Sequence, residues 1–275
     1  MSAADEEAAL LGLAPVAPDR TVSYGPHPDQ VVDLYGRWPG SGPLVVLLHG
    51  GFWRAAYDRH HLSPCAAELA RHGLPVALAE YRRVGAGGGA PQTFQDVPAA
   101  VAAAADAGAV PGAGPREVVL VGHSAGGHLA LLAAARPGTP VTEVIAVAPV
   151  ADLARAHELG LSDGAVAGLL GTGPGFAGRL AAADPVRHPP AGVPVTLLHG
   201  TDDPDVPVDL SRRYAAAHPA ATALRELPGT GHFAALTPGT GPFRTLLALL
   251  RGEAFDTGPA PGEPLGGGPT APRST

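Results

Sequence analysis

One short segment limits the folds open to this chain more than any other. Residues 122–126 have the sequence Gly-His-Ser-Ala-Gly, between an apolar run at residues 117–121 and a run rich in alanine and leucine at residues 128–136. These runs predict a buried strand followed by a helix, with Ser124 in the sharp turn between them. Glycines on both sides of the serine allow the strand and the helix to approach each other. Because the chain contains 38 glycines, the motif alone also fits an ordinary glycine-rich turn, and other segments must decide.

The rest of the chain alternates between strand-like and helix-like segments. Mostly apolar runs predict strands at residues 43–48, 75–81, 117–121, 141–150, 193–198 and 222–227. Helices are predicted at residues 58–72, 93–107, 128–136, 208–218 and 242–251. Upstream, a turn-rich stretch joins residues 21–24 and 30–35, which predict a hairpin. The alternation predicts an α/β fold with a doubly wound, mostly parallel sheet and helices on both faces.

Three parts of different composition follow one another along the chain. Residues 1–19 are polar and interrupted by proline, which predicts a flexible N-terminal arm with one short helical turn. Residues 20–255 carry the alternating pattern and predict one domain, in which residues 151–191 lack a strand and predict a short cap insertion. Glycine, proline and threonine dominate residues 256–275, so we expect a disordered C-terminal tail.

Composition and charge exclude several classes of protein. With 275 residues, of which 45% are hydrophobic and 16% charged, the chain can bury the core of a folded domain. A net charge of −7 without any basic run argues against a nucleic-acid partner. No apolar run approaches the roughly 18 residues of a membrane span, and the acidic start does not resemble a signal peptide. Because Cys65 is the single cysteine, no intramolecular disulfide can form, and we expect a cytoplasmic protein without a membrane partner.

A serine nucleophile needs a base that accepts its proton and a carboxylate that orients the base. The strand predicted at residues 193–198 leads into residues 199–207, which contain Asp202, Asp203 and Asp205. This loop resembles the His-Gly-x-x-Asp-x-x-Val-Pro pattern of serine hydrolases, in which the acid stands at the position of Asp203. Asp203 is therefore favoured as the acid, with Asp202 and Asp205 as alternatives.

The base is expected after the next strand. A glycine-rich segment follows residues 222–227 and ends in His232 and Phe233. The chain has 12 histidines, but His232 has both the required order after Ser124 and a position at the end of a strand, where such folds place functional loops. His123 and His128 flank the serine and are expected to be structural.

A tetrahedral intermediate also needs N–H donors for its oxyanion. The backbone N–H of Ala125, directly after the serine, is one candidate. The strand predicted at residues 43–48 ends in His-Gly-Gly-Phe-Trp, so the backbone N–H groups of Gly51 and Phe52 are the others. Trp53 and Phe233 are predicted to contact the substrate as aromatic walls of the pocket.

In this order the motifs resemble those of the α/β-hydrolase superfamily over residues 20–252, and within it the esterase and kynurenine formamidase (arylformamidase) group. Residues 24–35, which lead to the His-Gly-Gly-Phe-Trp turn, are similar to the corresponding segment of that group. The resemblance implies Ser124, Asp203 and His232 as a catalytic triad. Phe52 departs from the tyrosine common there, which leaves the backbone N–H unaffected.

The expected function is therefore hydrolysis of a small carboxylic ester (EC 3.1.1) or an aryl formamide (EC 3.5.1) through an acyl-enzyme. An exopeptidase or lactonase with the same triad is the alternative, and a catalytically silent binding protein is a further one. We expect no cofactor and no metal, because the sequence lacks His-Glu-x-x-His and the adjacent His60 and His61 would diverge on a helix. The expected partner is the small-molecule substrate alone.

Overall fold

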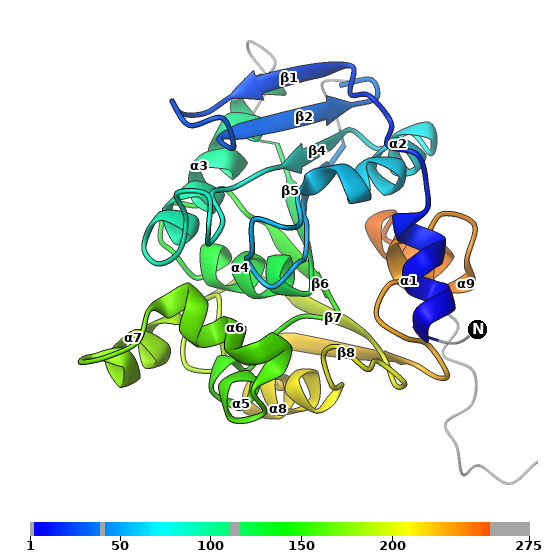
Figure 1. Cartoon of the computed structure of the whole chain (residues 1–275). Helices are drawn as coiled ribbons and strands as arrows, with labels where there is room; N and C mark the ends of the chain where they lie inside the picture. Colours follow the sequence, from blue (N-terminus) through cyan, green and yellow to red (C-terminus); the bar gives the residue numbers. More distant parts are fainter. Residues whose placement is uncertain (1–2, 39–41, 110–115, 254–275) are drawn as a thin grey trace, which may run out of the picture.

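The strands of the protein join into one eight-stranded sheet at the centre of the molecule (Figure 1). A computed structural model of the chain describes residues 3–38, 42–109 and 116–253. The order across the sheet is β1-β2-β4-β3-β5-β6-β7-β8. The strands are β1 Arg20–Ser23, β2 Val31–Tyr35, β3 Leu44–Leu48, β4 Val76–Ala79, β5 Val118–His123, β6 Glu143–Val147, β7 Val195–Gly200 and β8 Thr222–Leu227. β1 and β2 pair antiparallel, β2 pairs antiparallel with β4, and all other pairs are parallel.

Helices cover both faces of this sheet, as the sequence predicts. The α-helices are α1 Ala3–Leu11, α2 Ser63–Arg71, α3 Gln92–Ala107, α4 Ala125–Ala134, α5 Leu153–Glu158, α6 Leu161–Leu170, α7 Phe176–Ala183, α8 Asp209–Ala217 and α9 Gly241–Leu250. Two short 3₁₀ helices are η1 Arg59–Leu62 and η2 Ala234–Leu236. In Figure 1, α3 and α4 lie on one side of the sheet, and α1, α2 and α9 lie on the other. The doubly wound, mostly parallel architecture is confirmed.

Strand β3 shows why the apolar runs form buried strands. Leu44, Val46 and Leu48 pack into the core cluster that contains residues of α3, α4 and α8. Val45 and Leu47 point to the opposite face and pack with residues of α2 and α9. Successive side chains of a strand alternate between the two faces, so a strand covered on both faces needs an unbroken apolar run. Because β3 to β8 pair in parallel, their carboxyl ends and the loops that follow them lie at one edge of the sheet.

The N-terminal segment differs from the flexible arm that the sequence predicts. Residues 3–11 form the helix α1, and Leu10 lies fully buried in the core cluster with α2 and α9. Glu6 is also buried, and its carboxylate accepts the Gly231 N–H at 3.1 Å. The polar and alanine-rich composition of this segment gives no indication of these contacts. They depend on two side chains, Leu10 in the core and Glu6 at the loop that contains Gly231.

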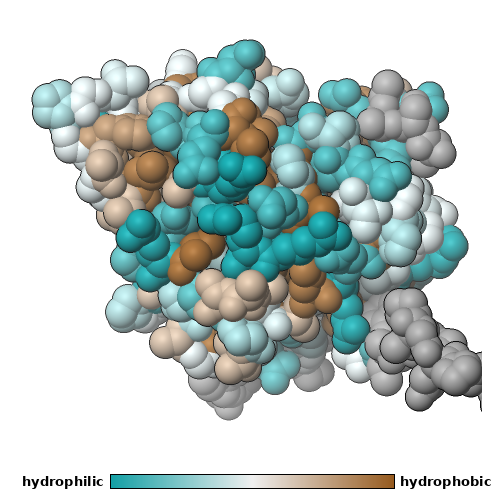
Figure 2. All heavy atoms as spheres, turned by 90° about the horizontal axis from the view of Figure 1, so that it is seen from below, coloured by the Kyte–Doolittle hydropathy of each residue, from teal (hydrophilic) through white to brown (hydrophobic). Residues whose placement is uncertain are grey.

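The predicted cap insertion contains the helices α5, α6 and α7 and no strand among the described residues. The tail predicted at residues 256–275 lies outside the described residues. No helix among the described residues combines the length and the apolarity that crossing a bilayer requires. Seen from below in Figure 2, hydrophobic residues form separate patches between hydrophilic ones.

Candidate active site at the carboxyl edge of the sheet

Ser124 lies in the turn between β5 and α4, in a backbone conformation that residues other than glycine rarely adopt. Its φ is 55° and its ψ is −118°. Such a conformation costs about 1–3 kcal/mol and persists only where surrounding contacts hold it. The Ser124 N–H donates to the Val147 carbonyl at 2.9 Å, and the Ser124 carbonyl accepts the Val150 N–H at 3.2 Å. Strain at this turn is therefore held by the neighbouring strand β6 and the residues after it.

The glycines around Ser124 are required by close contacts between backbones. A Cβ on Gly122 would lie 2.3 Å from the carbonyl oxygen of Gly126, and a Cβ on Gly126 would lie 2.4 Å from that of His49. A Cβ on Gly127 would lie 2.6 Å from the Cβ of Pro149. These separations are shorter than side-chain carbons tolerate, so the steric demand inferred from the sequence is present.

His232 follows β8 and is held by Asp203, which follows β7. The Nδ1 of His232 lies 2.6 Å from Oδ2 of Asp203, and Oδ1 accepts the N–H groups of Asp205 and Val206 at 2.9 Å. Burial alone would raise the pKa of Asp203, but hydrogen bonds from His199 and His232 outweigh it and hold that pKa well below its ordinary value. Asp203 is therefore ionised at neutral pH. With its Nδ1–H directed at this carboxylate, His232 keeps Nε2 free to accept a proton.

The structure distinguishes the three acids of this loop. Asp203 is the one that is hydrogen-bonded to His232. Asp202 is exposed and accepts a hydrogen bond from the Thr201 hydroxyl at 2.8 Å. Asp205 is also exposed and lies at the mouth of the cavity described below.

His199, at the end of β7, supports Asp203 and was not singled out by the sequence analysis. It is fully buried, with Nε2 3.3 Å from Oδ2 of Asp203 and 2.8 Å from the Val206 carbonyl. Its Nδ1 lies 2.7 Å from the Ser211 hydroxyl on α8. The first position of the His-Gly-x-x-Asp pattern was the signal that could have identified it.

Ser124 and His232 line the same cavity, which has a volume of about 80 Å³. Phe233 also lines it, as predicted, and meets the His232 ring edge-on at 4.9 Å between centroids. Several other residues that line the cavity were not expected there from the sequence, namely Glu7, Leu11, Tyr57, His61 and, as a pocket residue, Asp205. The first two belong to α1, and no sequence signal linked that segment to the serine.

Trp53 does not line this cavity, contrary to its predicted role in substrate binding. It is 1% exposed and packs in the core, where its ring meets that of His128 edge-on at 5.2 Å. Its φ of 59° turns the chain sharply at this position. The direction of a side chain on such a turn cannot be inferred from the sequence. The prediction that Trp53 contacts the substrate was therefore wrong, because its ring points into the core.

The loop after β3 brings its backbone next to Ser124. A Cβ on Gly50 would lie 3.0 Å from the Cβ of Ser124. The next two residues have positive φ, 109° at Gly51 and 48° at Phe52, and no acceptor for their N–H groups is found within the described part of the chain. Ala125 is the first residue of α4, and an N–H at that position has no partner inside its own helix. The three N–H groups have the unpaired state that an oxyanion hole requires.

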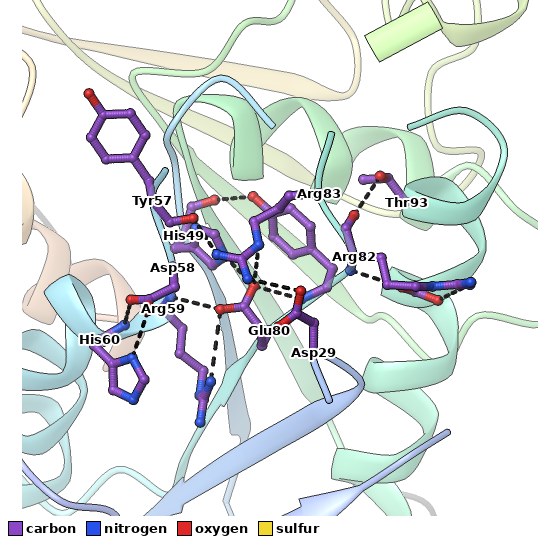
Figure 3. A network of polar contacts seen from close by, with 12 residues as sticks. Asp29, His49, Tyr57, Asp58, Arg59, His60, Glu80, Arg82, Arg83 and Thr93 are labelled. Atoms are coloured by element: carbon purple, nitrogen blue, oxygen red, sulfur yellow. Dashed lines mark hydrogen bonds and ion pairs between the residues drawn. The ribbon is translucent and has the colours of Figure 1, made fainter. Parts of the chain in front are cut away.

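A buried charged network anchors this loop (Figure 3). Glu80 is fully buried and accepts from His49 Nε2 at 2.8 Å and from the Arg59 backbone N–H at 3.0 Å. Arg83 places its Nε 3.3 Å from Glu80 and donates to the Tyr57 carbonyl at 2.5 Å. Burial alone would raise the pKa of Glu80, but the charge and hydrogen bond of His49 and the charge of Arg83 lower it. The Glu80 carboxylate, which is ionised at neutral pH, therefore connects both ends of the loop after β3 through His49 and Arg59.

His123 and His128 are structural, as expected. The His123 Nε2–H donates to the His232 carbonyl at 3.0 Å, and the His128 Nε2–H donates to the Ala183 carbonyl at 2.9 Å. Burial lowers the pKa of His128 to about 4, and burial together with the charge of His232 holds the pKa of His123 well below its ordinary value. Both rings are therefore neutral at pH 7.

In the part of the chain that the structure describes, one group of side chains offers metal-ligand atoms close together. Asp203, Asp205 and His232 each contribute one such atom, and the three atoms lie within 4.8 Å of one another. Asp203 and His232 are already paired at 2.6 Å. A metal ion here would have to break the hydrogen bond that orients His232, so the donor set does not fit a metal centre beside an intact pair.

Known proteins resemble this chain in sequence family and in fold. The sequence model of the BD-FAE family matches residues 33–217. A truncated carbohydrate esterase from gut microbiota is 19% identical with a TM-score of 0.72, covering 87% of this chain and 99% of that one. Esterase B from Lactobacillus rhamnosis is 23% identical with a TM-score of 0.72, covering 91% and 90%. A putative thioesterase from Silicibacter sp. is 25% identical with a TM-score of 0.65, covering 90% of each chain. No curated protein matched the sequence. These structures confirm the fold class that the sequence predicts.

Proposed function

The chain belongs to the BD-FAE family and is an α/β-hydrolase, and we propose that it is a serine esterase of small carboxylic esters or aryl formamides. One observation carries the proposal: Ser124, on its strained turn, shares a cavity with His232, whose Nδ1 is fixed by Asp203 at 2.6 Å. A nucleophile, a base and an orienting carboxylate in this relation perform acyl transfer on several unrelated folds. The esterases among the similar structures support the same chemistry.

In this mechanism, the Oγ of Ser124 attacks the carbonyl carbon while Nε2 of His232 takes the hydroxyl proton. The carbonyl π electrons move onto oxygen, and the N–H groups of Gly51, Phe52 and Ala125 stabilise the resulting oxyanion. Each such donor contributes roughly 2.7–4 kcal/mol to lowering the barrier. Collapse of the tetrahedral intermediate expels the alcohol or amine, which takes its proton from His232.

Water completes the reaction by the same steps. His232 removes a proton from the water, the hydroxide attacks the acyl-Ser124 carbonyl, and Ser124 leaves with the proton returned by His232. Asp203 stays ionised throughout and stabilises the transient imidazolium. No cofactor enters the reaction.

The enclosed space favours small acyl groups. Ser124 lies in a cavity of about 80 Å³. A formyl, acetyl or propionyl group fits such a site more readily than a long acyl chain. Formyl amides and acetyl esters both meet this restriction, so the proposal covers both bond types.

The proposal is tested by steady-state kinetics on wild type and Ser124→Ala. Wild type should hydrolyse p-nitrophenyl acetate, and the variant should lose about 10³-fold or more in kcat/KM with an unchanged circular dichroism spectrum. N-formylkynurenine, a short peptide and a lactone, measured beside the ester, decide which bond is preferred. An ester or formamide should lead by orders of magnitude. Retention of ester hydrolysis by Ser124→Ala would exclude the proposed nucleophile.

A further inference from the structure

We propose that the alcohol part of the substrate carries a positive charge, and that Glu7 of α1 and Asp205 select it. The inference rests on the proposed esterase function and adds the class of substrate. It follows from the charges, the aromatic rings and the origin of the cavity walls around Ser124.

Helix α1 is a fixed wall of the cavity. Leu10 anchors the helix in the core, and Glu6 accepts the Gly231 N–H at 3.1 Å, directly before His232. The next positions along the helix, Glu7 and Leu11, line the cavity that contains Ser124. The helix therefore holds a carboxylate and an aliphatic side chain beside the reacting groups.

The two acids at the cavity have no compensating charge. Glu7 and Asp205 are exposed, and within the described residues neither side-chain carboxylate has a hydrogen bond or an ion pair with another side chain. Among the described residues, no arginine lines the cavity. Two unpaired anions at one opening make its potential negative, and the net charge of −7 acts in the same direction.

Two arginines around the loop after β3 are already paired with acids, and Arg54 in that loop donates to the Ser162 carbonyl and does not line the cavity. Arg59 lies 2.6 Å from Asp33 and Arg83 lies 3.0 Å from Asp29, while both also face Glu80. His61 lines the cavity, but burial lowers its pKa to about 4, so it is neutral at pH 7. None of these groups offsets the negative charge of the opening.

Aromatic rings at the same cavity add a second attraction for a cation. Phe52, Tyr57 and Phe233 line it together with the two acids. The face of an aromatic ring attracts ammonium groups by about 0.5–2 kcal/mol, with the larger values where water is excluded. Acidic side chains and rings around one cavity favour an ammonium group over a neutral group of equal size and disfavour a carboxylate.

The position of His232 assigns its side of the cavity, with the exposed Glu7 and Asp205, to the alcohol, and it leaves the interior beside Ser124 to the small acyl group. His232 protonates the departing oxygen, so the alcohol must lie on the His232 side of the carbonyl. The carboxylate of Asp205 offers an oxygen within 4.8 Å of a His232 ring nitrogen. The inferred substrate is therefore an ester of a small acid with an amino alcohol or a quaternary ammonium alcohol.

A set of acetate esters matched in shape tests the inference. Acetylcholine carries the cation, 3,3-dimethylbutyl acetate replaces its nitrogen by carbon, and 3-acetoxypropionate carries an anion. In the wild type at low ionic strength, kcat/KM should be about 3- to 30-fold higher for acetylcholine than for the carbon isostere, and lowest for the anion. The preference should shrink as salt is added, because exposed charges are screened.

Variants of the acids identify the source of the preference. Glu7→Gln combined with Asp205→Asn should reduce the acetylcholine-to-isostere ratio by about 3-fold or more, and Glu7→Arg should raise the relative rate for 3-acetoxypropionate. Asp106→Asn is the matched control, because it removes one exposed negative charge from α3 and does not line the cavity.

The outcomes separate this inference from the proposed function. A wild-type ratio of one or less, or a ratio that the double variant leaves unchanged, overturns the inference while the esterase stands. If the carbon isostere and p-nitrophenyl acetate are both left intact, or are cleaved equally by Ser124→Ala, the proposed function itself fails.

Discussion

Asp203 illustrates how single residues define this site. Three acids share its loop, and one of them combines burial, a 2.6 Å contact to His232 and two backbone N–H donors. His199 adds a further contact at 3.3 Å to Oδ2, the same oxygen that His232 contacts. The charge is therefore held in place before any substrate arrives, which is what a base needs in order to present one tautomer.

Replacement of each acid by its amide tests the assignment. Asp203→Asn should lower kcat by about 10⁴-fold, because an amide NH₂ facing Nδ1 favours the tautomer in which Nε2 already carries a proton. Asp202→Asn serves as the control for the loop, since Asp202 is exposed and contacts Thr201.

The measurement is kcat for p-nitrophenyl acetate at pH 7–8, with KM reported separately for each variant. Asp205→Asn should affect kcat far less than Asp203→Asn does. Equal losses in Asp202→Asn and Asp203→Asn would show that the acid has been wrongly assigned.

Single residues were predictable where a local pattern fixed their position. Ser124, Asp203 and His232 follow strand ends in a set order, so the sequence alone identified them as candidates. Glu7 was not predictable, because its place at the cavity depends on how α1 docks through Leu10. Trp53 was misplaced, because its inward direction depends on a positive φ that no local pattern specifies.

At the level of elements, the turn between β5 and α4 requires that three backbones meet. Gly126 lies against the backbone of both Leu48 and His49, so the turn that holds Ser124 and the loop that offers N–H donors are in direct contact. A displacement of the turn or of the loop would change the distance between the Ser124 hydroxyl and the N–H donors for the oxyanion. The elements of the site are therefore coupled through one glycine.

Gly126→Ala tests this coupling. The added Cβ would lie 2.4 Å from the His49 carbonyl oxygen and 2.5 Å from that of Leu48. Overpacking of this kind costs about 1–3 kcal/mol or more, so the free energy of unfolding from urea titration should fall by at least that amount, and kcat should fall with it.

Gly178→Ala is the matched control, because Gly178 lies in α7 with no atom within 4 Å of the added carbon. That variant should gain about 0.5–1 kcal/mol from helix propensity. Equal stability of the two variants would contradict the close contact.

Elements were more predictable than their contacts. Apolar runs located the central strands, since a strand buried on both faces has an unbroken apolar sequence. The exact ends of the elements were harder to predict from the sequence. The helix predicted at residues 58–72, for example, is a 3₁₀ turn, η1, followed by α2. Within residues 1–19 the sequence predicts one short helical turn, whereas α1 has 9 residues and docks through Leu10 and Glu6, because an alanine-rich segment followed by two prolines carries no sign of those distant partners.

For the whole molecule, buried neutral histidines set the response of stability to acid. Burial lowers the pKa of His61 and of His128 to about 4, and it holds the pKa of His123 well below its ordinary value. In the unfolded chain each titrates near 6.5. Between these values the unfolded state binds protons that the native state does not, so stability falls as the pH drops from about 6.5 toward 4.

The expected slope is about 1.4 kcal/mol per pH unit for each histidine that is fully protonated only when unfolded. Urea titrations at pH 7, 6 and 5 measure it. His128→Gln should make the slope shallower, because glutamine can still donate to the Ala183 carbonyl but does not titrate. His188→Gln, at an exposed position in the cap, is the control. An unchanged slope in His128→Gln would contradict the assignment of a neutral buried ring.

Below about pH 4 a second loss is expected. Asp203 and Glu80 have pKa values lowered in the folded state, so their contribution is complete above their unfolded values and is lost as the pH falls through the folded ones. Acid should therefore unfold the protein in two overlapping stages, with the histidines titrating first.

Covalent labelling with a fluorophosphonate identifies the nucleophile without assuming a substrate. Wild-type protein incubated with a fluorophosphonate should gain the mass of one adduct, and fragmentation should place it on Ser124, because a serine activated by His232 attacks phosphorus and expels fluoride. Ser124→Ala should gain no mass under the same conditions, and His232→Ala should react far more slowly. An adduct on another residue, or undiminished labelling of Ser124→Ala, would contradict the claim that Ser124 is the nucleophile.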